Sequence, residues 1–265
     1  MENPDIEFMK GQLSRGSKRR KNRRMKQTIP PPEEQSSFRR REEGIRFDMH
    51  VHSEYSSDAL TPVGSIVRSW ERYSVLPLVC DHNTIAGSVK VYHEICKNDP
   101  DIPVIHAEEI LTSEGEIIGF FLQEEIPAFM SADETLDCIR DQGALSIVPH
   151  PFCSFRSSVI RPDVLDRIVH RVDIIEGFNG RAVDLRDNEL ACRYAARYRL
   201  PVSAGSDAHV PEELGKTYLT MGSFSSPRDL LREIRNAAVN YRRAHPPRHP
   251  FNRILPPGLK GGIMT

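Results

Sequence analysis

Short apolar runs alternate with amphipathic segments between residues 46 and 240. The apolar runs predict strands at Arg46–His50, Leu76–Cys80, Pro103–Ala107, Glu116–Leu122, Ala144–Pro149, Val172–Phe178, Pro201–Ala204 and Thr217–Met221. Helices are expected between them, near 62–73, 86–97, 131–142, 162–170, 186–198 and 227–239. Strands that alternate with helices over this length are typical of a parallel β/α architecture, either a barrel or a doubly wound sheet.

Two of the expected helices carry clear boundary signals. Thr61 and Pro62 are a suitable N-cap and first residue for the helix that runs to Tyr73. Ser131 and Glu134 have the spacing of a capping box, and Gly143 provides a stop for the helix that they begin.

Charge divides the chain into three parts. Residues 1–46 contain 13 Lys or Arg and 7 Asp or Glu, residues 47–240 contain 18 and 30, and residues 241–265 contain five basic residues and no acid. We therefore predict a disordered basic arm at 1–45, an acidic folded domain at 46–240 and an irregular Pro/Gly-rich tail at 241–265. The arm is a candidate for nucleic-acid backbone contact, although a solvated tail is the simpler interpretation.

The rest of the composition predicts a soluble protein of the cytoplasm. No stretch approaches the roughly 18 apolar residues that a membrane span requires. The N-terminal residues lack the apolar segment of a secretory signal. The five cysteines are odd in number and form no C-x-x-C pair, so neither a disulfide framework nor a zinc ribbon is indicated.

Histidine and carboxylate side chains gather at the ends of five predicted strands. They follow the first, second, third, fifth and seventh strands, at His50 and His52, His82, Glu108 and Glu109, His150, and Asp207 and His209. Since the carboxyl ends of parallel strands meet at one face, we expect these side chains to converge there. A mixture of imidazole and carboxylate favours zinc, manganese or iron over magnesium or calcium.

Five ordered motifs resemble those of the polymerase and histidinol phosphatase (PHP) superfamily. They are FDMHVHSEYSSDAL, CDHNTIAG, VIHAEEI, VPHPF and AGSDAH, spread from about Phe47 to Leu231. The segment IEGFNGR, residues 175–181, is similar to a motif of the small stand-alone PHP proteins. The resemblance implies a distorted seven-stranded β/α barrel that hydrolyses phosphate mono- or diesters with two or three metal ions.

The same resemblance implies a ligand set, residue by residue. A first metal would lie among His50, His52, Glu109 and Asp207; Glu109 and His150 would hold a second; and Asp58, His82 and His209 would hold a third. The family usually has Gly near the place where His106-Ala107 precedes the two glutamates. Strand alternation favours Glu109 as the ligand and Glu108 as its neighbour. Asp48 and Asp81 are candidates for orienting imidazoles.

Hydrolysis is expected to use a metal-bound hydroxide, and no separate general acid is assigned. Arg156, Asn179 and Arg181 are the candidate substrate-binding residues, because a guanidinium can contact phosphate oxygens in pairs. The expected substrate is a small phosphorylated compound or a nucleotide. Two alternatives stay open: a nuclease acting at RNA or DNA ends, and a non-catalytic metal-binding interaction module.

Overall fold

A computed structural model describes residues 44–244. The strands are β1 (Ile45–Val51), β2 (Val75–Val79), β3 (Ala107–Thr112), β4 (Gly115–Phe120), β5 (Leu145–Val148), β6 (Ile174–Asn179), β7 (Val202–Gly205), β8 (Tyr218–Met221) and β9 (Ala238–Asn240). The α-helices are α2 (Val63–Tyr73), α3 (Ala86–Asn98), α4 (Ala132–Asp141), α5 (Pro162–Ile168), α6 (Leu185–Tyr198) and α7 (Pro227–Ile234). Almost all of the predicted arm, and the predicted tail beyond Ala244, lie outside the described residues.

The strands form two mixed sheets, in the orders β2-β1-β8-β9 and β3-β4-β5-β6-β7. The pairs β1/β2, β5/β6 and β6/β7 are parallel, whereas β3/β4, β4/β5, β1/β8 and β8/β9 are antiparallel. The α/β class is therefore confirmed, and a wholly parallel sheet is wrong. Only residues 113–114 separate β3 from β4, which permits a hairpin but not the dozen or more residues of a parallel crossover.

Two short junctions connect the sheets. At one, the Asp207 amide donates to the His50 carbonyl at 2.7 Å, and the His52 amide donates to the Ala208 carbonyl at 3.0 Å. At the other, the Glu109 amide donates to the Asp81 carbonyl at 3.1 Å. Within residues 44–244 these junctions contribute isolated bridges and no continuous ladder, so a closed barrel sheet is not confirmed.

A glycine permits the close approach of β7 and β1. A Cβ atom added to Gly205 would lie 2.3 Å from the His50 Cβ and 2.7 Å from the His50 amide nitrogen. No side chain fits in that space. The packing at Gly205 therefore brings the ends of these two strands together.

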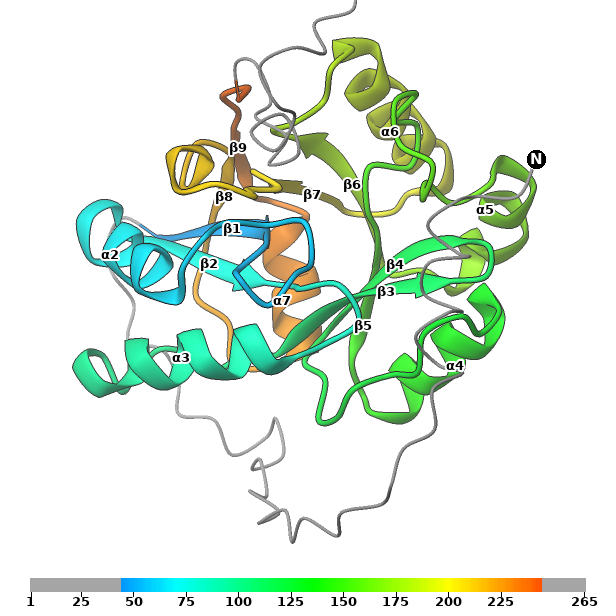
Figure 1. Ribbon diagram of the computed structural model, residues 1–265. Helices are drawn as coiled ribbons and strands as arrows, with labels where there is room; N and C mark the ends of the chain where they lie inside the picture. Colours follow the sequence, from blue (N-terminus) through cyan, green and yellow to red (C-terminus); the bar gives the residue numbers. More distant parts are fainter. Residues whose placement is uncertain (1–43, 245–265) are drawn as a thin grey trace, which may run out of the picture. The chain divides into compact units, whose positions relative to one another are not determined.

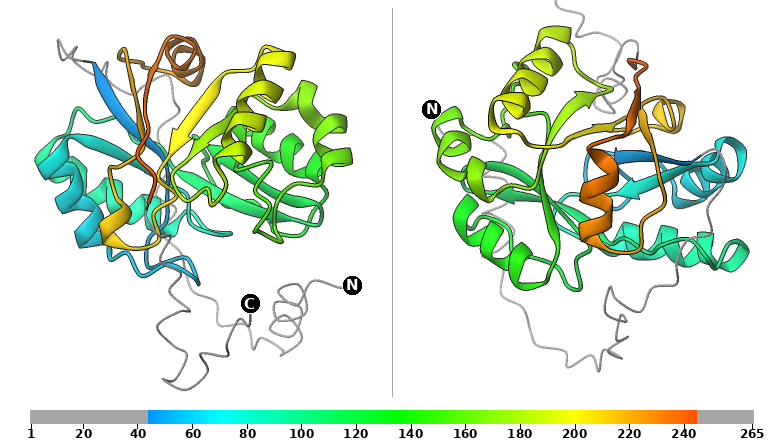
Figure 2. Two further views of the ribbon diagram at one scale, coloured as in Figure 1. Left: turned by 90° about the horizontal axis from the view of Figure 1, so that it is seen from above. Right: turned by 180° about the vertical axis from the view of Figure 1, so that it is seen from behind.

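Helices α2 to α6 lie along the outer sides of the two sheets (Figures 1 and 2). α2 and α3 accompany β2, whereas α4, α5 and α6 flank the five-stranded sheet. Strands covered in this way are buried on both faces, as in β2, where all five residues are buried. None of the helices within residues 44–244 is long and apolar enough to cross a membrane.

Most predicted elements match the structure to within two residues. One strand and one helix differ by more, and one helix cap is shifted by a residue. Val104–His106 precede the third strand instead of forming it, because regular pairing with β4 begins only at Ala107. The last predicted helix ends at Ile234, and β9 follows it. Pro62, not Thr61, takes the N-cap position of α2, with an extended backbone and no side-chain cap.

The capping box of α4 is confirmed. The Glu134 amide donates to the Ser131 hydroxyl at 3.3 Å, and the Ser131 amide donates to the Glu134 carboxylate at 2.9 Å. Gly143 follows with a φ of 68°, the left-handed conformation that glycine favours after a helix.

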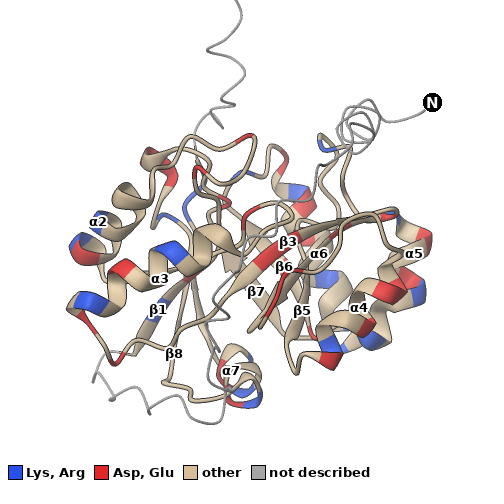
Figure 3. Cartoon of the chain, turned by 60° about the horizontal axis from the view of Figure 1, so that its bottom comes forward, with Lys and Arg blue, Asp and Glu red and all other residues tan. Residues whose placement is uncertain are grey.

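A surface ion-pair network links α4, α5 and the turn between β3 and β4. Its members are Glu114, Asp133, Asp137, Arg161, Arg167 and Arg171. Arg167 contacts Glu114 at 2.7 Å and Asp133 at 3.0 Å. Figure 3 shows basic and acidic residues side by side along these two helices. The network joins neighbouring elements by pairs of opposite charge.

Candidate metal centre

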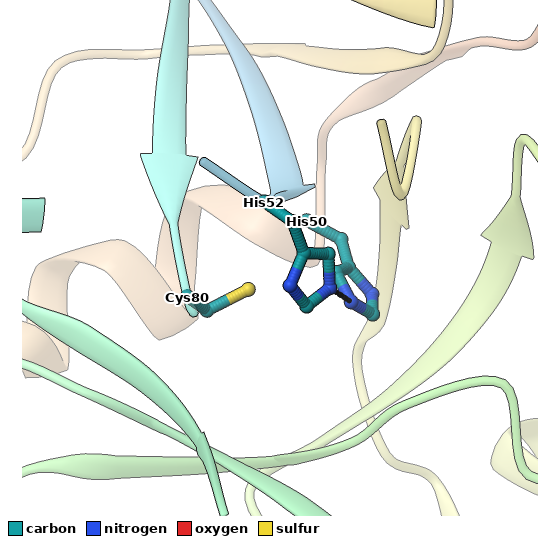
Figure 4. A group of neighbouring side chains, drawn as sticks. All are labelled: His50, His52 and Cys80. Carbon is teal, nitrogen blue, oxygen red and sulfur yellow. Dashed lines mark hydrogen bonds between the residues drawn. The ribbon is translucent and has the colours of Figure 1, made fainter. Parts of the chain in front are cut away.

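His50 and His52 project from the end of β1 to the same side, because side chains two residues apart share a face of a strand. Their Nε2 atoms lie 3.0 Å apart, and both rings are fully buried (Figure 4). The Cys80 thiol, which follows β2, lies toward the same two rings. Burial raises the pKa of Cys80 well above its ordinary value, and the thiol donates to the Val51 carbonyl at 3.9 Å. Cys80 therefore has a partner inside the protein.

Glu109 and Asp207 add one carboxylate oxygen each to this histidine pair. Glu109 Oε2 lies 3.4 Å from His50 Nε2 and 3.1 Å from His52 Nε2. Asp207 Oδ1 lies 3.6 Å from His50 Nε2 and 3.5 Å from His52 Nε2. Two nitrogens and two oxygens thus converge on one point from β1, β3 and the end of β7.

This donor set fits a tetrahedral metal ion. Bonds of about 2.0–2.1 Å to nitrogen and oxygen would separate tetrahedral donors by roughly 3.3–3.4 Å, in the middle of the observed separations. Glu109 Oε2 and Asp207 Oδ1 are also buried oxygens without a hydrogen-bond partner among the described residues. A buried carboxylate oxygen with no donor is costly, and a cation between these atoms would satisfy both.

A second group surrounds the other Glu109 oxygen. Glu109 Oε1 lies 3.2 Å from His150 Nε2, and Glu116 Oε2 lies 3.8 Å from the same nitrogen. Glu116 Oε1 lies 3.8 Å from His82 Nδ1. Burial, and then the charge of Glu109, raise the pKa of Glu116. Glu109, Glu116 and His82 form one of the side-chain groups that could hold an ion.

Glu116 was missed by the sequence analysis. It lies at the start of the apolar segment Glu116–Leu122, where it looks like a boundary residue. The hairpin of β3 and β4 pairs it with Leu111 and turns its side chain into the site. One feature of the sequence could have revealed Glu116: it is a carboxylate at the start of a segment whose other residues are apolar or glycine.

A third group comprises Asp58, His82 and His209. His82 Nε2 lies 3.5 Å from Asp58 Oδ1, and His209 Nε2 lies 3.2 Å from Asp58 Oδ2. Asp58 Oδ1 is another buried oxygen that has no hydrogen-bond partner in the described part of the chain. The Asp58 and His82 side chains are 30% and 18% exposed, so the centre reaches solvent on this side.

Two carboxylates of the centre, Glu109 and Asp207, are held in their ionised form. Burial favours the neutral acid, but Arg156 and His50 together hold the pKa of Asp207 well below its ordinary value. Against the same effect of burial, His50 and His82 hold the pKa of Glu109 well below its ordinary value. Ionised carboxylates beside imidazoles are the form in which these side chains bind metals.

Glu176 holds several parts of the centre in place. Its carboxylate accepts from His50 Nδ1 at 2.9 Å, from the His150 amide at 2.7 Å and from Asn179 Nδ2 at 3.0 Å. Carboxylate contacts of this kind orient metal-binding imidazoles. Glu176 belongs to the motif IEGFNGR, and no role was predicted for it from the sequence. The feature of the sequence that could have revealed this role is a charged residue inside the largely apolar segment DIIEGF.

The remaining predicted polar residues lie around the centre. Asp81 accepts from the Ser56 hydroxyl at 2.8 Å, and Ser56 contacts His52 Nδ1 at 3.0 Å, so Asp81 acts on His52 through a serine. Asp48 accepts from the Ser206 amide at 2.7 Å. Glu108 points away from the centre and accepts from the Ile126 amide.

The three predicted substrate-binding residues differ in their surroundings. Arg156 pairs with Asp207, and its Nη1 lies 3.4 Å from His150 Nε2. Arg181 is buried, and its charge also lowers the pKa of Asp207. Asn179 Nδ2 donates to both Glu176 and Asp207, and its Oδ1 accepts from the Arg181 amide. The Asn179 amide is thus engaged within the protein.

Two residues of the centre have unusual backbone conformations. His150 has a φ of 31° and Asp207 a φ of 53°. Such left-handed values are uncommon for residues other than glycine and cost of order 1 kcal/mol or more each. His150 lies two residues after the end of β5, and Asp207 lies two residues after the end of β7. The strain therefore occurs where the chain turns a predicted ligand into the centre.

The chain is similar to several known proteins. A family model described as PHP-associated matches residues 186–239. The uncharacterized protein MJ0417 of Methanocaldococcus jannaschii is 36% identical over 191 residues, which cover 70% of this chain and 75% of that protein.

Among the solved structures that share the fold, two illustrate the likeness. One is a two-domain protein from Bacteroides vulgatus containing a predicted PHP-like metal-dependent phosphoesterase, with 17% identity over 85% of this chain and 70% of that chain and a TM-score of 0.58. The other is endonuclease Q in complex with a 27-mer duplex substrate that carries an abasic lesion. It has 15% identity over 72% of this chain and 56% of that chain, with a TM-score of 0.52. The PHP-associated family model, the ordered motifs and the related fold agree: the chain belongs to the PHP superfamily.

Proposed function

We propose that this protein is a metal-dependent phosphoric ester hydrolase that acts on a small phosphorylated substrate or a nucleotide. Two or three ions of manganese, zinc or iron would be held by the eight predicted ligands and Glu116. The observation that carries the proposal is a pair of buried oxygens, Glu109 Oε2 and Asp207 Oδ1, beside the imidazoles of His50 and His52. Neither oxygen has a hydrogen-bond partner within residues 44–244. The mixed nitrogen and oxygen donors suit these metals better than magnesium or calcium.

The charge of the centre supports the need for cations. Its four carboxylates, Asp58, Glu109, Glu116 and Asp207, would repel a phosphate group in the absence of compensating charge. Bound divalent ions would balance that charge, stabilise negative charge on the phosphate and activate water.

The chain itself offers groups for binding the phosphate. The Arg156 guanidinium reaches Asp207 and His150 from the loop that follows β5. Arg181 adds a second cation from the loop that follows β6. We propose that these two residues bind phosphate oxygens, and that Asn179 positions Asp207 through its amide.

Solvent access favours a catalytic centre over a structural one. Structural zinc sites are closed, whereas catalytic sites keep an open position. Asp58 and His82 are partly exposed, which leaves a route for a substrate. A non-catalytic interaction module would have no need of this opening.

We further propose that β1 to β7 form one distorted barrel, joined at the Asp207 and Glu109 junctions. In that arrangement the centre would lie where the two sheets meet. A nuclease acting at RNA or DNA ends is the second candidate, because endonuclease Q, which has a related fold, was solved on a DNA substrate. The basic arm predicted to support such binding lies outside the described residues.

The test is hydrolysis of an aryl phosphate by full-length protein that has been stripped with a chelator and reloaded with manganese, zinc or iron. Hydrolysis should require the metal and fall steeply in Arg156→Ala through a higher KM. Arg161→Ala removes an arginine of the surface ion-pair network and should change neither value. Activity without metal would refute the proposal, and unchanged kinetics in Arg156→Ala would remove the phosphate-binding role of that residue.

A further inference from the structure

Two loops beside the metal centre combine an inward charge with an outward aromatic ring. In the β1–α2 loop Asp58 points to His82 and His209, whereas Tyr55 is 46% exposed. In the β5–α5 loop Arg156 reaches Asp207, whereas the preceding Phe155 is 68% exposed. Single exposed apolar residues are ordinary, but each of these two lies within three residues of a charged group of the centre.

The β1–α2 loop is held in a fixed conformation. The Glu54 amide donates to the Thr61 carbonyl at 2.9 Å, which closes the loop at its ends. Inside it, the Ser56 hydroxyl donates to Asp81 at 2.8 Å. The Leu60 amide donates to the His209 carbonyl at 2.7 Å, and the Leu60 side chain is 51% exposed. The loop therefore displays Tyr55 and Leu60 without the freedom to bury them.

The β5–α5 loop is also fixed on both sides of Phe155. Before it, the Cys153 amide donates to the His150 carbonyl at 3.0 Å, and the Ser154 amide contacts Asp187 at 3.4 Å. After it, the Ser158 hydroxyl donates to Glu116 at 2.7 Å. These contacts set the direction of Arg156 and Phe155 together.

We propose that Tyr55 and Phe155 form a stacking surface for a nucleobase, so that the substrate is a nucleotide, free or at the end of a strand. This inference rests on the proposed function, since the phosphate would lie at the metal centre beside Arg156. Charged groups recognise the phosphate, and exposed rings on a rigid loop match the planar, apolar face that every base offers. A sugar phosphate has no such face and would leave both rings in water.

The experiment compares phosphate release from adenosine 5′-phosphate, adenosine 3′-phosphate and ribose 5-phosphate by the full-length, manganese-loaded protein. We expect the better nucleotide to exceed ribose 5-phosphate in kcat/KM by about five- to a hundredfold, the range of one stacking contact. Phe155→Ala and Tyr55→Ala should each reduce this ratio, and Phe155→Trp should restore it. A short single strand with a terminal phosphate distinguishes a strand end from a free nucleotide.

Tyr73→Ala is the matched control, because Tyr73 is a 47% exposed aromatic residue at the end of α2, outside the two loops, and it should leave the ratio unchanged. Equal rates for nucleotides and ribose 5-phosphate, or a ratio that neither ring variant changes, would overturn the stacking surface while leaving phosphoester hydrolysis intact. If no phosphate ester is hydrolysed, the proposed function fails instead. Calorimetric binding of adenosine 5′-phosphate against ribose 5-phosphate then decides the stacking question with the same variants.

Discussion

The metal centre and the surface ion-pair network are both dense in charge, yet they are built in opposite ways. In the network each carboxylate faces a guanidinium, as where Arg171 lies 2.5 Å from both Asp133 and Asp137, and the side chains are partly exposed. In the centre Glu109 and Asp207 are fully buried, and Glu109 Oε2 and Asp207 Oδ1 have no hydrogen-bond donor within residues 44–244.

This difference separates a structural role for charge from a functional one. Exposed pairs that satisfy each other contribute little stability and need no further partner. Buried oxygens left without a donor are costly, and a bound cation would offset that cost for these two. Such an oxygen beside two imidazoles, more than the number of charges, marks the site.

The largest expected effect comes from Asp207→Asn. The amide keeps the shape of the side chain but replaces an anionic ligand, so metal binding and hydrolysis should both be lost. Elemental analysis and a thermal-unfolding titration with manganese would measure the loss, since a ligand that binds only the folded state raises Tm.

Asp133→Asn is the matched control for that change. It removes one carboxylate from the network and should bind metal as the unmodified protein does. If Asp207→Asn bound as much metal as the unmodified protein, the centre would not differ from the network in its need for a cation.

A smaller loss is expected from Glu176→Gln. Three donors, from His50, His150 and Asn179, converge on this carboxylate, and an amide offers only one acceptor oxygen. Metal affinity should fall by about 10- to 100-fold, the usual effect of altering a group that orients a ligand. Metal titration measures this directly, and Glu189→Gln on the exposed side of α6 should have no effect.

Glu108 tests whether burial alone creates a functional carboxylate. It lies next to Glu109 on β3 but accepts only from the Ile126 amide, and burial raises its pKa to about 7 from 4.5. Because the folded state binds the proton more tightly, the free energy of unfolding should fall as pH rises from 4.5 through 7. The cost should reach at most about 3 kcal/mol above that range.

Glu108→Gln should remove this pH dependence without reducing metal binding. Urea unfolding of both proteins at pH 5 and pH 8 provides the measurement. If metal affinity fell with Glu108→Gln as it does with Glu176→Gln, burial rather than placement would be the deciding property.

The smallest effect is expected from Arg171→Ala in the network. Exposed ion pairs are worth about 0–1 kcal/mol, so the free energy of unfolding should change within that range. Metal content and hydrolysis should stay the same. A loss of several kcal/mol would mean that the network is more than a surface feature.

The sequence predicted the convergence of the histidines because β1, β2, β5 and β7 end where the apolar pattern ends. It was wrong about why Glu109 joins them. Glu109 lies inside β3, opposite Ile118 of β4, and enters the site from the face of a hairpin. The pattern of apolar residues shows where strands lie but not which strands are antiparallel.

The roles of Glu116 and Glu176 in the centre were not predicted, for the same reason. A charge in an apolar segment can end a strand or lie within it, and only the pairing of strands decides which way it points. The roles of Asp81 and Ser56 required coordinates as well, because a contact through a serine leaves no spacing that a sequence pattern could reveal.

The left-handed backbone at His150 and Asp207 has an evolutionary consequence. Glycine at either position would relax the chain, so selection for thermal robustness alone would favour discarding these two side chains. A lineage that no longer needed the chemistry should lose them early, while Gly205 and the apolar strands endure. Descendants that keep the fold but lack His150 and Asp207 would then be recognisable as proteins that have lost the proposed activity.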